Sequence, residues 1–195
     1  MTRPLVGILV GGASRRMGGV AKGLLSLEET AGETIVGRLL RLTREEGLEV
    51  LLVGASTAYE ALATARIDDA QKDAGPLAGV VALLAHARRE GSARDVIALA
   101  CDLPAIERSV LHKLVNAPPA TATAPRVDGR WQPLVARYAS ATHEEAAARL
   151  ASGRHAMHAL LDAVSATELR LDAHERASLF DWDSPGDVAA SRAPR

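Results

Sequence analysis

Three runs of consecutive apolar residues, at 5–10, 49–53 and 95–100, alternate with segments of helical character along the first 115 residues. Apolar side chains at successive positions, rather than at every second one, indicate strands that are covered on both faces. A shorter strand is predicted at 67–69, where Ile67 runs into two acidic residues. Helices are predicted at 33–46, 57–65, 77–89 and 108–115. This alternation predicts an α/β fold with a mostly parallel sheet, helices on both faces, and ligand binding at the carboxyl ends of the strands.

The remaining residues are expected to complete the same domain, because 195 residues match the usual length of one domain. Residues 116–125 are rich in proline, alanine and threonine, which predicts a connection into an edge segment rather than a domain linker. A hairpin turn and strand entry are predicted at 129–133. Residues 149–161 predict two helices that join at Ser152 and Gly153.

Composition excludes several classes of function. The net charge is −1, from 23 basic and 24 acidic residues, so no overall field would draw the protein to nucleic acid or an anionic membrane. Cys101 is the only cysteine, which excludes a disulfide framework and predicts a reducing, cytoplasmic location. It is expected to be a small buried hydrophobic residue. The apolar run near the N-terminus is too short to span a bilayer, and we expect no signal or membrane segment.

The first predicted strand leads into a loop at 11–23 that combines glycines with Arg15, Arg16 and Lys22. Glycine lets backbone amide groups approach a ligand closely, so such a loop can bind an anion. The loop lacks the glycine order of a dinucleotide-binding fold, and Lys22 stands in the wrong place for a P-loop. A flexible surface loop with solvated arginines is the structural alternative.

Two acidic segments could hold a cation. Asp102 follows the strand at 95–100 directly, where a carboxylate could bind Mg²⁺ together with phosphate oxygens and water. A helix cap or Asx-turn is its alternative role. In the segment 180–185, alternation would place Asp181 and Asp183 toward the site, with Phe180 and Trp182 anchored in the core. Asp183 or Ser184 could instead cap a helix at 185–191.

Residues 75–79 have the sequence Gly-Pro-Leu-Ala-Gly, which places proline at the start of a helix and leaves room for a flat ligand beside Gly79. A ribose or base edge would fit, and a plain tight turn is the alternative. His155 and His158 do not predict a zinc site, because no third ligand lies close in the sequence.

Five segments together resemble the molybdenum cofactor guanylyltransferases, the MobA family of nucleotidyltransferases. The loop matches at Gly11, Gly12, Ser14, Arg16, Met17, Gly18 and Lys22. The second segment is Asp69 with residues 75–79, and the third is residues 101–104. The fourth comprises Gln132, Pro133, Leu134, Ala136 and Tyr138. The fifth comprises Asp181, Asp183, Ser184 and Pro185. The resemblance covers nearly the whole chain and implies a single Rossmann-like three-layer sandwich at 1–195. Within it, a nucleotide-binding part at about 1–115 would precede an acceptor-binding part at about 116–195.

The resemblance implies transfer of GMP from GTP to the terminal phosphate of molybdopterin, with Mg²⁺ as cofactor and pyrophosphate as product. It also implies transient contact with molybdoenzymes or other proteins of cofactor biosynthesis. The implied catalytic residues are Arg16, Lys22 and Asp102, and the implied metal ligands are Asp102 and Asp183. Nucleotide binding is implied for Leu9, Gly11, Gly12, Ser14, Arg15, Lys22, Ser56, Asp69, Gly75 and Asp102. Acceptor binding is implied for Asp181, Trp131 and Arg154.

The chain departs from the family pattern at Ala21, where an acidic residue is usual, and at Ser56, where the family carries a guanine-contacting asparagine. A serine hydroxyl cannot make the paired contact that an amide makes. Alternatives are therefore transfer of CMP to molybdopterin, a sugar-1-phosphate nucleotidyltransferase, and a nucleotide- or cofactor-binding module without catalysis.

Overall fold

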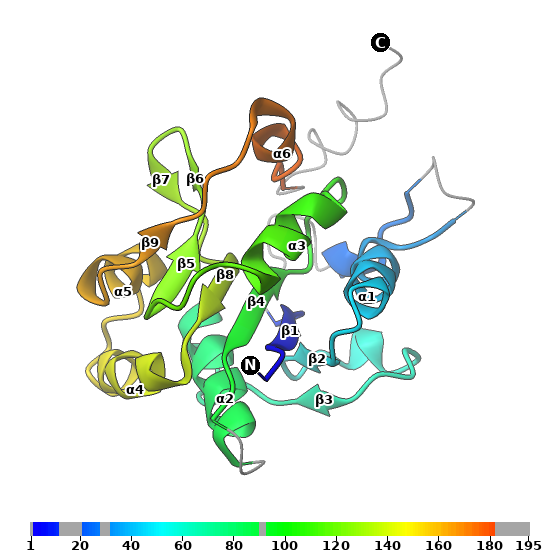
Figure 1. Cartoon of the computed structure of the whole chain (residues 1–195). Coiled ribbons are helices and arrows are strands. Elements are labelled where there is room, and N and C mark those ends of the chain that lie inside the picture. Colours follow the sequence, from blue (N-terminus) through cyan, green and yellow to red (C-terminus); the bar gives the residue numbers. More distant parts are fainter. Residues whose placement is uncertain (1, 12–20, 28–31, 90–92, 182–195) are drawn as a thin grey trace.

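The computed structural model describes residues 2–11, 21–27, 32–89 and 93–181, and its central element is a seven-stranded sheet (Figure 1). Strands β1 (Leu5–Leu9), β2 (Val50–Val53), β3 (Arg66–Ile67) and β4 (Val96–Ala100) run parallel. Strand β8 (Val135–Tyr138) pairs antiparallel with β4 and with β5 (Ala122–Ala124), which pairs parallel with β9 (Thr167–Glu168). The strand order is β3-β2-β1-β4-β8-β5-β9, and β6 (Arg126–Val127) and β7 (Arg130–Trp131) form a separate hairpin.

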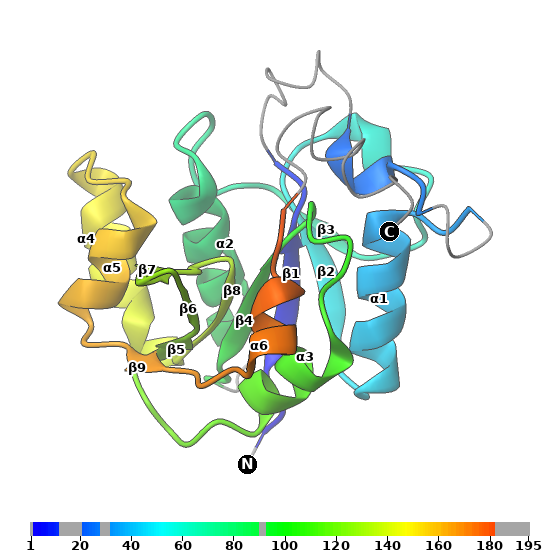
Figure 2. The ribbon, with the colours of Figure 1, turned by 90° about the horizontal axis from the view of Figure 1, so that it is seen from above.

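Helices cover both faces of this sheet, as Figure 2 shows in a view from above. On one face lie α1 (Ile35–Glu45), α3 (Arg108–Val115) and the short α6 (Ala173–Ala177). On the other lie α2 (Pro76–Arg89), α4 (His143–Ala151) and α5 (Met157–Ala163). Three single turns of 3-10 helix, η2 (Lys22–Leu24), η4 (Thr57–Tyr59) and η5 (Ser140–Thr142), complete the described elements. The predicted three-layer α/β sandwich with a mostly parallel sheet is confirmed.

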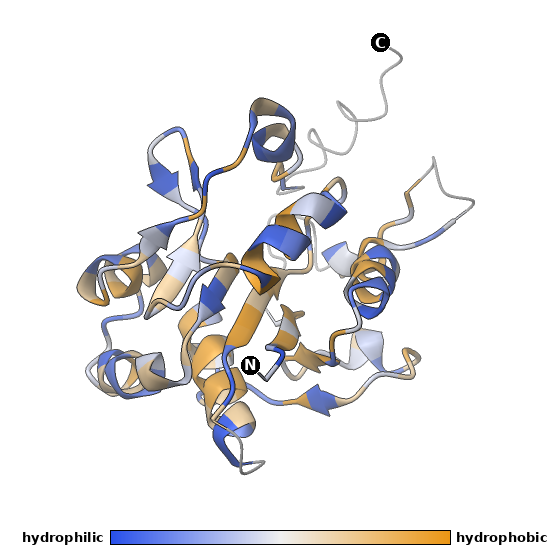
Figure 3. Ribbon diagram, in the orientation of Figure 1, coloured by the Kyte–Doolittle hydropathy of each residue, from blue (hydrophilic) through white to orange (hydrophobic). Residues whose placement is uncertain are grey.

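The sheet separates two apolar cores, and β1 contributes to both. Leu5 and Leu9 pack with α2, whereas Val6 and Ile8 pack with α1 and α3, because successive strand side chains point to opposite faces. Figure 3 shows the apolar residues concentrated on the central strands and on α2. Gly7 permits close packing here, since a Cβ at this position would lie 2.5 Å from Leu83 of α2. Double-sided burial explains why the strand sequence is continuously apolar.

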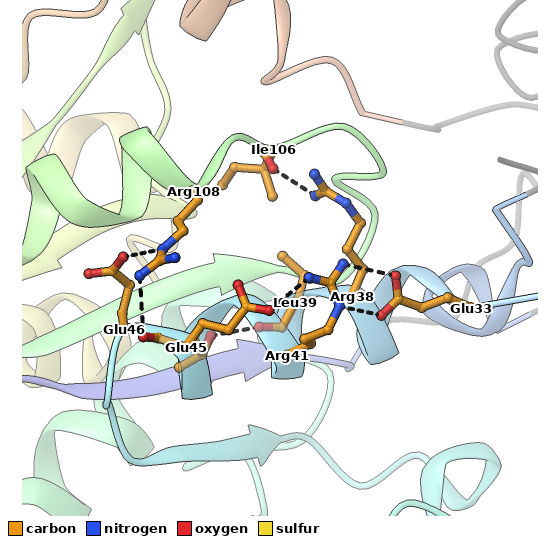
Figure 4. Close-up of polar contacts among 9 residues, drawn as sticks. Glu33, Arg38, Leu39, Arg41, Glu45, Glu46, Ile106 and Arg108 are labelled. Carbon is orange, nitrogen blue, oxygen red and sulfur yellow. Dashed lines mark hydrogen bonds and ion pairs between the residues drawn. The ribbon is translucent and has the colours of Figure 1, made fainter. Parts of the chain in front are cut away.

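Polar contacts fasten α1 to the segment that follows β4 (Figure 4). Arg38 donates to the Ile106 carbonyl at 2.6 Å, and Arg108 donates to the buried Glu46 carboxylate at 2.6 Å. The hydrogen bond from Arg108 lowers the pKa of Glu46 and outweighs the effect of burial. On the exposed side of α1, Arg41 pairs with Glu33 and Glu45. These contacts hold the beginning of α3 against α1 and so restrict the segment after β4.

Within the described residues the predicted helices and strands are confirmed except in two places, and the helix considered at 185–191 lies outside them. The helix predicted at 57–65 is wrong, because only the turn η4 forms there. Its bonds run from Glu60 to Thr57 and from Leu62 to Tyr59, and nine residues with high alanine content are too short to hold a helix by propensity alone. The edge prediction for 116–125 is also wrong, because β5 lies between β8 and β9 and it is β9 that forms the edge. No helix in the described ranges has the length and apolar character needed to cross a bilayer.

Thr34 caps α1, because its hydroxyl accepts a hydrogen bond from the Gly37 amide at 3.0 Å. We expect Thr34→Ala to lower the free energy of unfolding by about 1 kcal/mol, since one amide of the first turn loses its partner. Urea denaturation measures the change. Thr34→Ser keeps the hydroxyl and should retain most of the stability, and an equal loss in both variants would contradict the capping role.

Candidate functional site

Glycines and acidic residues follow the carboxyl ends of the four parallel strands, at one edge of the sheet. Gly11 follows β1 and Gly54 follows β2, while Asp69 and Asp102 follow β3 and β4. A Cβ on Gly54 would lie 2.6 Å from the Gly11 amide nitrogen, and Gly54 has a φ of +126°. The backbones after β1 and β2 therefore touch, and only glycine fits at residue 54. This contact brings the start of the glycine-rich loop close to the ends of the neighbouring strands.

Lys22 and Asp102 form an ion pair at this edge although 80 residues separate them in the chain. The Lys22 Nζ lies 3.3 Å from the Asp102 Oδ2, and their side chains are 13% and 19% exposed. Lys22 is the first residue of η2. The carbonyl of Leu25, the residue after η2, accepts a hydrogen bond from the amide of Ile35 at the start of α1. The structure thus brings together Lys22 and Asp102, two residues that the resemblance assigns to one site. The helix-cap alternative for Asp102 is wrong, because α3 begins at Arg108 and is capped at Glu107.

The surroundings of the Cys101 thiol disfavour its thiolate form. Burial raises its pKa to about 12, and the adjacent carboxylate of Asp102 acts in the same direction. Only the thiolate is a good nucleophile, and at this pKa almost none forms. Cys101 packs against the core of α1 and α3 as expected of a small apolar residue, but it is half-buried rather than fully buried.

Asp69 lies between the end of β1 and the first turns of α2. A Cβ on Gly11 would lie 3.1 Å from its Oδ2, and a Cβ on Gly79 would lie 3.1 Å from its Oδ1. Burial raises the pKa of Asp69, and the charge of Asp68 raises it further. Within the described part of the chain, its carboxylate has no hydrogen-bond or ion-pair partner. A half-buried acceptor between two glycines can take hydrogen bonds from a flat ligand.

We expect Asp69→Asn to raise the stability of the folded protein above pH 4. A carboxyl group with a raised pKa binds its proton more tightly when folded, so the native protein loses stability as pH rises from the ordinary value of 3.8 through the raised pKa. Asparagine has no charge to bury, so the variant avoids this loss. Urea denaturation at several pH values should show a difference that grows with pH and vanishes in acid. A constant difference at all pH values would contradict it.

The other predicted nucleotide-binding residues in the described ranges lie at the same edge. Leu9 is buried at the end of β1, and a Cβ on Gly79 would lie 3.0 Å from its Cδ2. Gly75 has a φ of +73° and precedes Pro76, the first residue of α2, as predicted. Ser56 follows β2 and is half-buried, and its carbonyl accepts a hydrogen bond from Arg66 at 2.9 Å. Gly12, Ser14, Arg15, Arg16 and Asp183 lie outside the described residues.

A magnesium ion would find one suitable ligand among the described residues. Mg²⁺ binds hard oxygen atoms and usually takes one or two carboxylates with phosphate oxygens and water, so it does not need a complete protein cage. The Asp102 carboxylate fits this requirement, being partly exposed at the sheet edge. The described part of the chain contains no group of three or more acidic, histidine or cysteine ligands. The donor set therefore suits an ion that arrives with a phosphate-bearing ligand.

The predicted acceptor residues are not brought together by contacts that the structure records. Trp131 is buried, its Nε1 donates to Asp162 at 2.8 Å, and the Arg126 guanidinium stacks 3.8 Å from its ring centroid. These contacts indicate a packing role. Arg154 is exposed and donates to the Ser152 hydroxyl. Acceptor binding by these residues stays a prediction.

Asp181 is exposed near the end of the described chain and takes part in a further interaction. The neighbouring Phe180 is 50% exposed, so the prediction that it anchors this segment in the core is wrong. Phe180 lies beyond the end of α6 at Ala177 and follows the buried Leu179, and half of its surface stays open to solvent. Trp182 lies outside the described residues.

Tyr59 and Gly23 belong to the site and were missed by the sequence reasoning. The Gly23 amide donates to the Tyr59 hydroxyl at 3.1 Å, next to the Lys22–Asp102 pair. Tyr59 is a lone aromatic residue in a segment predicted to be helical, so local pattern gave no sign of its role. The sequence shows Gly23 as the last glycine of the loop, but it does not show that the Gly23 amide contacts the Tyr59 hydroxyl.

Comparisons with known proteins agree with this geometry. Residues 6–167 match the model of a family described as the MobA-like NTP transferase domain. A molybdenum cofactor guanylyltransferase from Pseudomonas putida is 36% identical over 132 residues, which are 65% of this chain and 65% of that protein, just under two thirds of its length. A probable molybdenum cofactor guanylyltransferase from Opitutus terrae is 36% identical over 92% of this chain and 90% of its own length.

Among solved structures, molybdopterin-guanine dinucleotide biosynthesis protein A from Archaeoglobus fulgidus superposes with a TM-score of 0.76. The alignment covers 96% of both chains at 23% sequence identity. At this sequence identity the similarity bears on the fold alone. It shows that nearly the whole chain shares the fold of that protein.

Proposed function

Because this chain belongs to the MobA-like NTP transferase family, we propose that it transfers GMP from GTP to the terminal phosphate of molybdopterin. The names of its relatives from P. putida and O. terrae support this choice of substrates. The observation that carries the proposal is the Lys22–Asp102 pair at the carboxyl ends of the parallel strands. Ligands of open α/β sheets bind at this edge. A cation for phosphate and a carboxylate for a metal are what a nucleotidyl transfer needs there.

In the proposed reaction, an oxygen of the molybdopterin phosphate attacks the α-phosphorus of GTP. A new P–O bond forms, the bond between the α-phosphorus and the bridging oxygen to the β-phosphate breaks, and pyrophosphate leaves with that oxygen. Negative charge grows on the leaving group, so the protein contributes positioning and positive charge rather than a covalent nucleophile. The Lys22 ammonium supplies that charge, and Arg16 of the glycine-rich loop is proposed to act with it on the triphosphate.

We propose that Asp102 and Asp183 hold the Mg²⁺ that accompanies the triphosphate. When bound, this ion would neutralise phosphate charge and polarise the α-phosphoryl group. Asp102 serves in both states of the site: it pairs with Lys22 in the free protein and offers a carboxylate when the nucleotide brings its cation. Lys22 then turns its charge toward the phosphates, as a flexible lysine stem allows.

Asp69 is proposed to accept hydrogen bonds from the nucleotide, between Gly11 and Gly79, and Gly75 is proposed as a further nucleotide contact. Its half-buried carboxylate lies between glycines, whose lack of side chains leaves a flat group room to approach. Ser56 takes the position of the guanine-contacting asparagine of the family and offers a single hydroxyl. The split into a nucleotide-binding part and an acceptor-binding part, the contacts with molybdoenzymes and the cytoplasmic location stay predictions.

Pyrophosphate release, assayed with each of the four nucleoside triphosphates, Mg²⁺ and molybdopterin, tests the proposal. We expect release with GTP only, and only when molybdopterin is present. Release with CTP alone would replace GMP transfer by CMP transfer. If pyrophosphate were released only with a sugar 1-phosphate and not with molybdopterin, the acceptor would be the sugar 1-phosphate. Tight nucleotide binding without any release would make the chain a binding module.

A further inference from the structure

The Tyr59 hydroxyl lies between the two segments that carry the Lys22–Asp102 pair. It accepts a hydrogen bond at 3.1 Å from the amide of Gly23, the residue after Lys22. Cys101, the residue before Asp102, packs against the same apolar core as Tyr59. Tyr59 is therefore bonded to the chain neighbour of Lys22 and shares a core with the chain neighbour of Asp102.

The ring that carries this hydroxyl is held in place. Tyr59 is 3% exposed and packs in the core beneath α1. Gly23 lies directly against it, because a Cβ there would be 2.9 Å from the Tyr59 Oη and 2.4 Å from the Val36 Cγ2 of α1. A hydroxyl on a fixed ring defines how closely the η2 backbone can approach the sheet.

The turn η2 needs such support, since it is a single turn of 3-10 helix whose preceding residue, Ala21, gives no side-chain cap. Two backbone hydrogen bonds attach the segment after it to the start of α1, from Ile35 to Leu25 and from Leu27 to Glu33. Both lie beyond η2 and on the side of α1. The bond from the Gly23 amide to the Tyr59 hydroxyl ties the backbone of η2 itself, next to Lys22, to the segment after β2.

We propose that Tyr59 is a positioning residue, whose hydroxyl sets the place of Lys22 relative to Asp102 and so to the triphosphate. This inference rests on the proposed function, because it assigns the Lys22 ammonium to GTP. A displacement of about 1 Å at a reacting centre can cost up to a hundredfold in rate. A contact one residue away from the lysine is near enough to control such a displacement.

Removing the hydroxyl of a purely structural tyrosine should leave kcat/KM for GTP unchanged. Tyr138 is such a tyrosine and serves as the control. Tyr138 is also completely buried, and its hydroxyl donates to the Pro133 carbonyl at 2.7 Å. It packs in the core of α2, α4 and α5, on the face of the sheet opposite to Tyr59. Tyr138→Phe therefore removes a buried hydroxyl hydrogen bond without touching the segment of Lys22.

The test compares Tyr59→Phe with Tyr138→Phe in the full chain. We expect Tyr59→Phe to lower kcat/KM for GTP by about tenfold to a hundredfold and to weaken MgGTP binding, while Tyr138→Phe changes neither. Introduced into Lys22→Ala, the Tyr59→Phe change should cost less than about twofold further, because no ammonium is left to position. Amide hydrogen exchange should become faster at residues 22–24 in Tyr59→Phe only.

Several results would overturn the inference. These are unchanged kcat/KM in Tyr59→Phe, an equal loss in Tyr138→Phe, or a loss in the Lys22→Ala background as large as in the native one. Failure of the proposed function is a separate outcome, recognised when the native protein releases no pyrophosphate from any nucleotide. MgGTP affinity and amide exchange then decide the inference, and unchanged values in Tyr59→Phe would refute it.

Discussion

Asp102→Asn is expected to lower kcat/KM for GTP by about 10²–10³-fold, the scale for loss of one electrostatic stabiliser in a reacting site. Asparagine has the shape of aspartate but no charge, so it neither pairs with Lys22 as an ion nor neutralises a divalent cation. The chain should still fold, because Asp102 is partly exposed and lies outside both apolar cores. The measurement is pyrophosphate release at several Mg²⁺ concentrations, together with thermal unfolding.

Asp128→Asn is the matched control for this change. Asp128 is exposed in the β6–β7 hairpin, with a φ of 49° that asparagine adopts as readily as aspartate. It should keep native activity. Full Mg²⁺-dependent turnover in a folded Asp102→Asn variant would exclude Asp102 as a ligand of the metal–triphosphate complex.

Lys22→Ala is expected to lower kcat/KM for GTP by a similar factor of about 10²–10³. The ammonium is replaced by a methyl group, so the triphosphate and the leaving pyrophosphate lose a positive charge held at the sheet edge. Because the Lys22 Nζ lies 3.3 Å from the Asp102 Oδ2, the two substitutions should not be additive. Steady-state kinetics of both single variants and of the double variant measures this coupling.

Lys72→Ala serves as the control, since Lys72 is exposed and lies outside the described ion pairs. It should change neither kcat nor KM. If Lys22→Ala bound MgGTP and turned over like the native protein, the triphosphate would have to lie elsewhere. Strictly additive effects of Lys22→Ala and Asp102→Asn would indicate that the pair acts as two independent groups during turnover.

Much of the site could be predicted because its residues follow recognisable strands. Asp102 comes directly after the apolar run of β4, and Gly11 and Asp69 follow β1 and β3. Parallel strands expose their carboxyl ends at one edge, so the order of elements suffices to bring such residues together. Lys22 was predicted to bind the triphosphate from its place in the glycine-rich loop, and the structure places it beside Asp102.

Two of the three failures of prediction have a common physical cause. The segment 57–65 has the composition of a helix, yet it forms only η4, because the ring of Tyr59 is drawn into the core and the segment is too short to resist. Phe180 was placed in the core from alternation, but its side chain is 50% exposed. The β5 segment was expected at an edge, and the distant Thr167–Glu168 pairs beside it. For the segment 57–65 and for β5, partners far away in sequence outweighed the local pattern.

The sequence by itself determined the α/β layers, the parallel direction of the first strands, and which charged and glycine residues follow those strands. These follow from periodicity and from turn chemistry, which act over a few neighbouring residues. Only the tertiary structure decided that Tyr59 contacts Gly23, and that Trp131 donates a hydrogen bond to Asp162 and stacks with Arg126. Such contacts depend on distances between segments that packing brings together, and no local pattern of residues encodes those distances.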